Sequence, residues 1–354
     1  MVENILKKAL DGERISGEEA LQLFETTDMT LLGNVASRLA RKKQKEKVVT
    51  YIVDRNVNYT NICVTGCSFC AFYRHEKEAD AYVLPFETIA LKIEETVALG
   101  GRQILLQGGH NVNLRIDYFE DLFQKIKDRF DIHLHALSPP EIVHTAKVSR
   151  ISLDETLARL QRAGLDSIPG GGAEILVDRA RRKISPAKCT AGQWLEVMDK
   201  AHRLGIPTTA TMMFGHVETR AERVEHLLRL RDQQDKTGGF TAFIPWPYQP
   251  GHNELGLELQ GKYTTGWDYL KTLAISRIVL DNFDNIQSSW VTQGPKIGQM
   301  ALYYGANDMG SVMIEENVVR AAGTSYRLDE QEIRRLITDI GFAPRRRNMR
   351  YQYV

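Results

Sequence analysis

From residue 63 to residue 70 the chain reads Cys63-Val-Thr-Gly-Cys67-Ser-Phe-Cys70. Three of the four cysteines in 354 residues therefore lie within eight positions. A disulfide framework would be denser and would be spread through a smaller secreted domain, so metal binding or catalysis is the better interpretation. Three thiolates can bind three irons of a cubane cluster and leave the fourth iron without a protein ligand. The spacing predicts a 4Fe–4S cluster held by Cys63, Cys67 and Cys70.

A zinc site with Cys189 or a histidine as fourth ligand is the alternative. Zinc sites commonly combine two ligand pairs of the CxxC or HxxxH kind, and no second pair accompanies Cys189, which follows Lys188. A free cysteine packs as a small apolar residue, which is the ordinary expectation for Cys189. An iron–sulfur protein is therefore favoured over a zinc-stabilised binding protein, and metal content would separate the two.

From Val48 onward, short β-rich runs alternate with amphipathic helical stretches, which is typical of βα units around a parallel sheet. The predicted strands are 49–57, 103–107, 132–137, 165–168, 208–214, 240–244 and 286–289, and the predicted helices include 87–99, 118–130, 193–204 and 221–235. Capping-box spacing occurs at Ser16 and Glu19, Ser152 and Glu155, and Thr219 and Glu222.

The length suits one large (βα) barrel of the triose-phosphate-isomerase type, which typically takes about 250 residues, with extensions. We therefore predict an α/β fold with a barrel domain over 47–320. The amphipathic pattern before it predicts an N-terminal helical extension over 1–46, and 321–354 form a C-terminal extension packed on the barrel. No linker rich in Pro, Gly or Ser divides the chain.

The charge is balanced, with 46 basic and 45 acidic side chains, so the sequence predicts no nucleic-acid partner. The first ten residues form an amphipathic pattern without the apolar stretch of a signal peptide or membrane anchor. We therefore expect a cytoplasmic protein with no stable membrane association. The basic run 345–350 is expected to form a solvated or phosphate-touching face.

The cysteine loop with its flanks, from Arg55 to Arg74, resembles radical S-adenosylmethionine (radical SAM) enzymes, and within them the group that contains menaquinone-pathway enzymes and deazaflavin-forming synthases. Further segments resemble the family of cyclic dehypoxanthine futalosine synthases. They are Leu106-Gln-Gly-Gly-His-Asn111, His133-Leu-His-Ala-Leu-Ser-Pro-Pro-Glu-Ile142, Ser167-Ile-Pro-Gly-Gly-Gly-Ala-Glu-Ile175, Thr211-Met-Met-Phe-Gly-His216 and Phe243-Ile-Pro-Trp-Pro247.

This resemblance implies two cofactors, a 4Fe–4S cluster and S-adenosylmethionine (SAM), and a 5′-deoxyadenosyl radical that abstracts hydrogen from ribose C4′ of dehypoxanthine futalosine. The sugar radical then closes a spiro ring on the benzoate, and loss of an electron and a proton gives cyclic dehypoxanthine futalosine for menaquinone biosynthesis. The implied electron donor is a flavodoxin or ferredoxin. The alternative within the group is aminofutalosine synthase, which adds its radical to an enol ether.

The resemblance also implies SAM contacts. Phe69 occupies the aromatic position that places its backbone near the adenine, although it can simply pack the loop against the barrel. Gly108 and Gly109 follow a predicted strand, where glycine lets backbone approach a ligand or makes a plain turn. An acidic residue often follows such a pair in the superfamily, whereas this chain has His110. Glu174 matches the glutamate that contacts the SAM ribose in relatives.

The remaining candidates are polar side chains for the substrate or for proton transfer. His133 and His135 share one face of a predicted strand that continues toward Ser138, so the histidines and Ser138 could bind substrate and His135 could accept a proton. His216 has the same possible catalytic role, with a satisfied core histidine as the ordinary alternative. Arg74, Arg179 and Arg181 are candidates for a clamp on the benzoate carboxylate, although solvation at the surface is the expectation for any single one.

Overall fold

A computed structural model describes residues 2–44 and 47–354. Its N-terminal part is helical, as predicted, with α1 over Val2–Leu10, α2 over Gly17–Glu25 and α3 over Met29–Lys43. The capping box of Ser16 and Glu19 is formed at the start of α2. The predicted domain boundary between 46 and 47 falls at residues 45–46, which lie outside the described residues.

The strands form three parallel sheets, with the orders β7-β1-β8, β2-β3-β4 and β5-β6. Isolated parallel bridges connect these sheets: 167–168 join β4 to β5, and 286–287 join β6 to β7. Among the described residues no strand pairing joins β2 to β1 or β8, so the structure shows an α/β fold of parallel strands and leaves the closed barrel a prediction. The bounds are β1 Val48–Ile52, β2 Asn56–Asn58, β3 Gln103–Gln107, β4 His133–Ala136, β5 Thr208–Phe214, β6 Phe240–Pro247, β7 Asp308–Ser311 and β8 Ala343–Arg346.

Several predicted strands are corrected. The predicted strand 49–57 is divided into two strands, β1 and β2, which join different sheets. Between them the carboxylate of Asp54 accepts hydrogen bonds from Gln103 and Ser311. Predicted strands 165–168 and 286–289 make only single bridges to their neighbours, which is too little pairing for a ladder. Strand β6 runs three residues beyond the predicted end, and β7 and β8 were not predicted.

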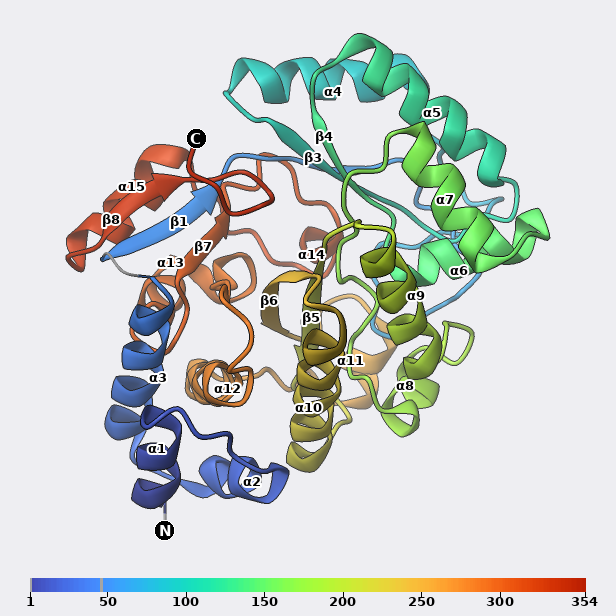
Figure 1. The fold of residues 1–354 in the computed structure, drawn as a ribbon. Helices are drawn as coiled ribbons and strands as arrows, with labels where there is room; N and C mark the ends of the chain where they lie inside the picture. The colour runs from blue at the N-terminus through green and yellow to red at the C-terminus, as the bar shows by residue number, and fades with distance from the viewer. Residues whose placement is uncertain (1, 45–46) are drawn as a thin grey trace.

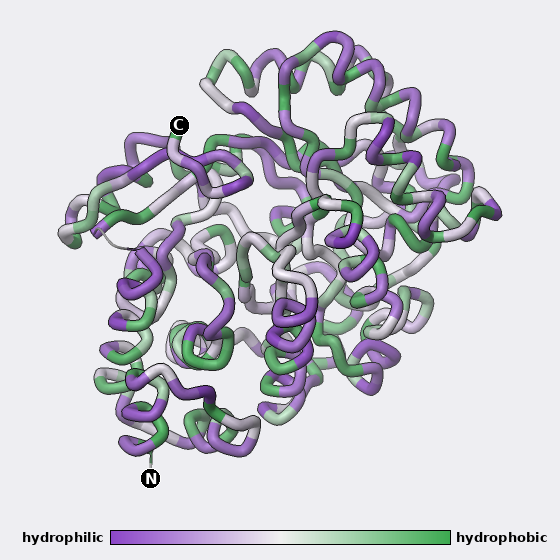
Figure 2. Tube along the Cα trace, in the orientation of Figure 1, coloured by the Kyte–Doolittle hydropathy of each residue, from purple (hydrophilic) through white to green (hydrophobic). Residues whose placement is uncertain are grey.

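The helices lie outside the strands in Figure 1, with α4 and α5 beside β3 and β4, and α10 beside β5 and β6. Helices α5 and α7 turn apolar faces inward and polar faces outward, as the alternating colours along them indicate in Figure 2. The four predicted helices match α4, α5, α9 and α10 within two residues at each end. The bounds are α4 Phe86–Ala98, α5 Ile116–Arg129, α6 Pro139–Ser149, α7 Leu153–Ala163, α8 Asp178–Ile184, α9 Ala191–Arg203, α10 Arg220–Thr237, α11 Glu254–Glu258, α12 Gly266–Val279, α13 Trp290–Ala301, α14 Val318–Ala321 and α15 Glu330–Asp339.

The N-terminal helices cover α12, which is buried continuously from Tyr269 to Val279. Lys271 of α12 donates to the carbonyls of Phe24 at 3.0 Å and Thr26 at 2.7 Å, at the end of α2. A fully buried leucine such as Leu273 contributes roughly 1.5–3 kcal/mol. Helices α2 and α3 are therefore part of the main hydrophobic core.

The basic C-terminal run agrees only in part with the predicted solvated face, since Arg345 and Arg350 are exposed whereas Arg346 is half-buried and Arg347 is buried. Arg346 forms an ion pair with Glu330, and Arg347 is 1% exposed and donates to the buried carboxylate of Asp308 at 2.5 Å. Strand β8 pairs with β1 along the edge of the sheet, and Arg347, the residue after it, is the buried one. In the part of the chain that the structure describes, no helix is long and apolar enough to cross a membrane.

Candidate active site

The cysteine loop follows β2 at the C-terminal end of that strand. Its backbone is fixed from several sides: Cys63 N donates to Arg74 O at 3.0 Å, Ser68 N to Ile184 O at 2.9 Å, and Leu255 N to Ser68 O at 2.9 Å. The loop is therefore held between the end of α8 and the start of α11. Active sites of parallel α/β folds occupy this edge of the sheet.

The glycine pair after β3 touches this loop. A Cβ on Gly109 would lie 2.2 Å from the carbonyl oxygen of Ile62, and one on Gly108 would lie 2.7 Å from the ring of Tyr59. Gly109 N also donates to Thr60 O at 3.0 Å. The pair was predicted as a SAM contact; in the structure it lets β3 approach the backbone next to Cys63.

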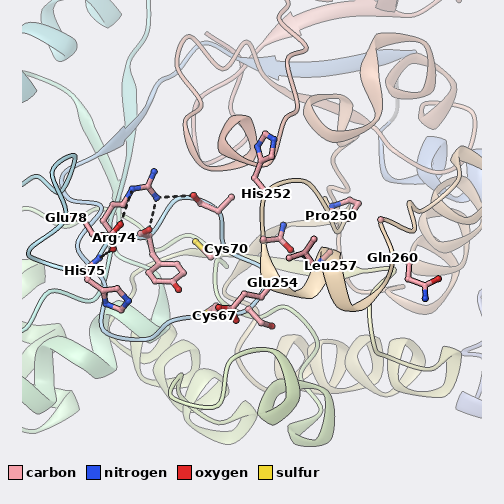
Figure 3. A pocket seen from close by; sticks show the side chains of 16 residues that line it. Cys67, Cys70, Arg74, His75, Glu78, Pro250, His252, Glu254, Leu257 and Gln260 are labelled. Carbon is pink, nitrogen blue, oxygen red and sulfur yellow. Dashed lines mark hydrogen bonds and ion pairs between the residues drawn. The ribbon is translucent and has the colours of Figure 1, made fainter.

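Two further side chains brace the loop. Arg74, predicted to bind the substrate carboxylate, donates to Asp80 at 2.7 Å and to the carbonyl of Tyr73 at 2.8 Å, and Figure 3 shows it within the loop. His110 lies where an acidic residue often occurs in the superfamily, and its Nδ1 is 2.7 Å from Thr65 Oγ1 between the first two cysteines. Both side chains support the shape of the loop.

Beside the cysteines lies a buried pair of opposite charge. Lys188 donates to Glu174 Oε1 at 2.7 Å, and its ammonium lies 5.2 Å from the ring centroid of Phe69. Burial acts to lower the pKa of Lys188, but Cys67 and Glu174 together raise it above its ordinary value, so the ammonium stays charged. Glu174 Oε2 is buried without a hydrogen-bond partner among the described residues. Two of the predicted SAM contacts, Phe69 and Glu174, are thus brought to the cysteine loop.

Two of the three loop cysteines border a space that could receive an iron–sulfur cluster. This cavity of about 640 Å³ is lined by Cys67 and Cys70 and, on its other side, by residues between 250 and 261, as seen in Figure 3; Cys63 does not line it. Burial raises the pKa of Cys67 to about 12, so metal binding must displace its proton. In the described ranges no three His, Cys, Asp or Glu side chains converge on one metal ion. Cys189 Sγ instead lies 3.8 Å from Arg181 Nη2, so the zinc alternative gains no support from the geometry.

A second cavity, of about 310 Å³, lies among the strand ends. Two loops link it to the cysteine loop: Gln107 precedes the glycine pair, and Gly170 and Gly171 precede Glu174. The cavity is largely apolar, with Trp246 from β6 in its wall. His135 borders it, and burial lowers the pKa of this histidine well below its ordinary value, so the ring is a neutral proton acceptor.

Arg74 borders the first cavity, whereas His216, Arg179 and Ser138 border neither cavity. His216 has a fully buried side chain, with Nε2 3.0 Å from Met213 O and Nδ1 3.2 Å from Glu218. Burial lowers its pKa even beside that carboxylate, and Nδ1 has no hydrogen-bond partner among the described residues, so His216 is a buried core histidine. Arg179 is paired with Glu222 at 2.5 Å on the outside of the molecule.

Ser138 and Arg181 are likewise used for structure. The backbone N–H of Ser138 donates to the carboxylate of Glu141 at 2.7 Å, at the start of α6. Arg181 is buried and donates to the carbonyls of Gly172 at 3.1 Å and Cys189 at 2.6 Å. It therefore shapes the loop that carries Glu174.

Sequence reasoning missed two buried charged residues. Lys188 belongs to no recognisable motif, and its role depends on its contact with Glu174, which lies 14 positions earlier in the chain. Glu141 accepts hydrogen bonds from Tyr59 Oη and Gly108 N, both at 2.9 Å, and so ties the glycine pair to α6. The three-residue spacing from Ser138 to Glu141 is a capping-box signal that could have found it.

Comparison with known families agrees with this geometry. Residues 57–230 match the model of the radical SAM superfamily, and residues 237–354 match the CofH/MqnC C-terminal region. The chain therefore belongs to the radical SAM superfamily of enzymes. Within that superfamily it belongs to the CofH/MqnC group. Membership implies a 4Fe–4S cluster and SAM as cofactors.

Three full-length relatives illustrate the group. The chain is 46% identical to the cyclic dehypoxanthine futalosine synthase of Halalkalibacterium halodurans, over 100% of this chain and 95% of the relative. It is 43% identical to the 5-amino-6-(D-ribitylamino)uracil–L-tyrosine 4-hydroxyphenyl transferase of Methanothermobacter thermautotrophicus, over 99% and 97%. It is 41% identical to the aminodeoxyfutalosine synthase of Thermus thermophilus, over 99% and 95%.

The fold is also found among solved structures. That of methylornithine synthase (PylB) is similar with a TM-score of 0.74 at 17% identity, over 96% of this chain and 97% of that one. The likeness extends to the α/β fold of radical SAM enzymes along nearly the whole chain.

Proposed function

We propose that this radical SAM enzyme is a cyclic dehypoxanthine futalosine synthase, which converts dehypoxanthine futalosine to its cyclic product in menaquinone biosynthesis. The observation that carries the proposal is the 46% identity over the whole chain to a synthase of that name. The hydroxyphenyl transferases and aminodeoxyfutalosine synthases are only a few per cent less similar, so their reactions are the competing candidates.

The cofactors would be held at the cysteine loop. Cys63, Cys67 and Cys70 would bind the cluster, and the buried ammonium of Lys188 would offset its negative charge. Glu174 Oε2, which is buried without a hydrogen-bond partner in the described ranges and lies 3.9 Å from Arg181 Nη1, would accept hydrogen bonds from SAM, with Phe69 nearby. When bound, these groups supply the 5′-deoxyadenosyl radical that removes the hydrogen at ribose C4′.

The substrate would occupy the 310 Å³ cavity, whose volume lies within the range of small-molecule sites, about 300–1,000 Å³. Trp246 offers an aromatic wall for the benzoate ring, and Asn56 and Thr211 offer hydrogen bonds to ribose hydroxyls. The neutral ring of His135 would take the proton that leaves when the product becomes aromatic. Apolar walls would keep water from the radical.

The proposal includes the organisation expected from the sequence: a closed barrel domain over 47–320, flanked by a helical extension and a C-terminal extension. It also includes a cytoplasmic location and a flavodoxin or ferredoxin as electron donor. The balanced surface charge gives no reason to expect a nucleic-acid partner.

A substrate panel tests the proposal. The anaerobically reconstituted enzyme is given dithionite, SAM and, in separate reactions, dehypoxanthine futalosine, the enol ether substrate of the aminofutalosine reaction, or L-tyrosine with 5-amino-6-(D-ribitylamino)uracil. We expect 5′-deoxyadenosine and a coupled organic product from dehypoxanthine futalosine alone, and neither from a Cys67→Ala variant. Efficient coupling with another substrate would replace the proposed reaction while keeping the enzyme class.

A further inference from the structure

Ser167 joins two histidines of β4. Its Oγ lies 2.7 Å from His133 Nε2 and 2.7 Å from His135 Nδ1. A hydroxyl has a single proton, so it donates to one ring and accepts from the other. The three side chains therefore form a hydrogen-bonded chain in which all the donors point the same way at any one time.

The two ends of this chain open into different spaces. His135 borders the 310 Å³ cavity, whereas His133 is half-buried and borders a separate space of about 20 Å³ beside Asn348 and Val354. A space of about 10–15 Å³ is enough for one water molecule. Four residues line both spaces and form the wall between them: Ile52, Gln103, Arg347 and Met349. The hydrogen-bonded chain thus crosses from the cavity to the outer side.

The free ring nitrogens suit transfer in this direction. His135 uses Nδ1 for Ser167, which leaves Nε2 for the cavity, and His133 uses Nε2, which leaves Nδ1 for the outer space. Burial lowers the pKa of both rings, so both are neutral near pH 7. The charged groups that act on them are Asp166, Lys127 and Arg350 around His133, and Arg347 and His133 itself around His135.

We propose that His135, Ser167 and His133 form a proton relay that carries the proton released in the last step of the cyclisation out of the cavity. The assignment rests on the proposed function. In that step a C–H bond of the radical adduct breaks. The two electrons of this bond and the unpaired electron of the adduct make three electrons. Two of them stay in the aromatic ring, and the third passes to an acceptor of the iron–sulfur class.

The proton then moves with no change in the number of protons on the protein, but both imidazole tautomers and the direction of the hydrogen-bonded chain are reversed and must return before the next turnover. It binds His135 Nε2 as the Nδ1 proton of that ring passes to Ser167, the hydroxyl proton passes to His133 Nε2, and the Nδ1 proton of His133 leaves to water. A competing acceptor is present: Asp54 also borders the cavity, and Gln103 and Ser311 donate to its carboxylate.

Ser167→Ala removes the link, and Ser167→Thr keeps a hydroxyl in its place. Because proton transfer by positioned groups contributes about 10²–10⁴-fold, we expect Ser167→Ala to slow the cyclised product by about 100-fold. Formation of 5′-deoxyadenosine should continue, and the solvent deuterium isotope effect on cyclisation should rise. His202→Gln is the matched control, since this histidine bonds two threonine hydroxyls away from the cavity.

A second pair of measurements guards against a purely structural effect. Imidazole should restore cyclisation to His133→Ala, and nitrogen-15 spectra of the histidine rings should shift at both His133 and His135 in Ser167→Ala. The relay alone would be overturned if Ser167→Ala and His133→Ala cyclised the substrate at the wild-type rate with the wild-type isotope effect. A loss of cyclisation confined to Asp54→Asn would overturn it too. A wild-type enzyme that forms no cyclised product overturns the proposed function and this assignment with it.

Discussion

Replacing Gly109 by alanine should displace the cysteine loop. The added Cβ would lie 2.2 Å from Ile62 O and 2.9 Å from Cys63 Cβ, whereas ordinary contacts begin near 3.4 Å. The loop backbone must therefore retreat by about 1 Å, since the obstructing oxygen belongs to the main chain and cannot rotate away. Overpacking of this kind costs about 1–3 kcal/mol, and a misplacement of about 1 Å can lower a rate about 100-fold.

Iron and sulfide content after anaerobic reconstitution, with 5′-deoxyadenosine formation, measures this effect. We expect Gly109→Ala to bind less iron and to lose activity by about 100-fold while its circular dichroism stays native. Gly192→Ala is the matched control, because its Cβ would meet Thr190 Oγ1 at 3.9 Å and alanine favours the helix by up to about 1 kcal/mol. Full iron content and wild-type cleavage in Gly109→Ala would refute the argument.

Three further predictions concern ionisable side chains. Lys188→Met leaves the Glu174 carboxylate buried without the ammonium that donates to it, so the free energy of unfolding should fall by about 3–5 kcal/mol. Urea titrations measure this change, and a loss below about 1 kcal/mol would contradict the prediction. Arg179→Ala breaks an outer ion pair with Glu222, so stability should fall by about 0–1 kcal/mol with unchanged cyclisation, and a large rise in KM would restore Arg179 as a substrate residue. Burial lowers the pKa of His226 from 6.5 to about 3, so the unfolded chain binds its proton first and stability falls as pH drops from 6.5 toward 3. Denaturation at several pH values should show a smaller acid loss for His226→Gln, and an identical pH dependence would contradict the buried neutral ring.

The periodic parts of the fold could be predicted from the sequence. Strands β3 and β5 match their predicted bounds, because each is an apolar run of β-forming residues closed by polar or glycine-rich sequence. The capping boxes at Ser16 and Thr219 are formed with both of their hydrogen bonds. At Ser152 the serine accepts from Glu155 N, which is half of the predicted pair.

The errors follow from long-range contacts. Strand β7 was missed because Asp308-Met-Gly-Ser311 has weak β propensity and is fixed by pairing with β1, about 250 residues earlier in the chain. The ion pairs of Arg346 and Arg347 within the basic C-terminal run were not predicted because their partners, Glu330 and Asp308, lie outside the local pattern. The local sequence does not determine which acidic side chain will pair with a given basic one.

The candidate site divides in the same way. The cysteine loop and the position of Glu174 near it could be predicted because both motifs are local, while the binding of SAM by Glu174 stays a prediction. The partners of Arg74 and His216 could not be predicted, because they are set by the tertiary fold. Arg74 instead supports the cysteine loop, and His216 meets Glu218 in the interior.

Transfer of a labelled hydrogen tests the central claim most directly. Dehypoxanthine futalosine that carries deuterium at ribose C4′ is incubated with the reconstituted enzyme, dithionite and SAM, and both products are weighed by mass spectrometry. The account predicts that 5′-deoxyadenosine gains one deuterium and that the cyclised product forms in step with it. Unlabelled 5′-deoxyadenosine, or a cyclised product that keeps the deuterium, would contradict it.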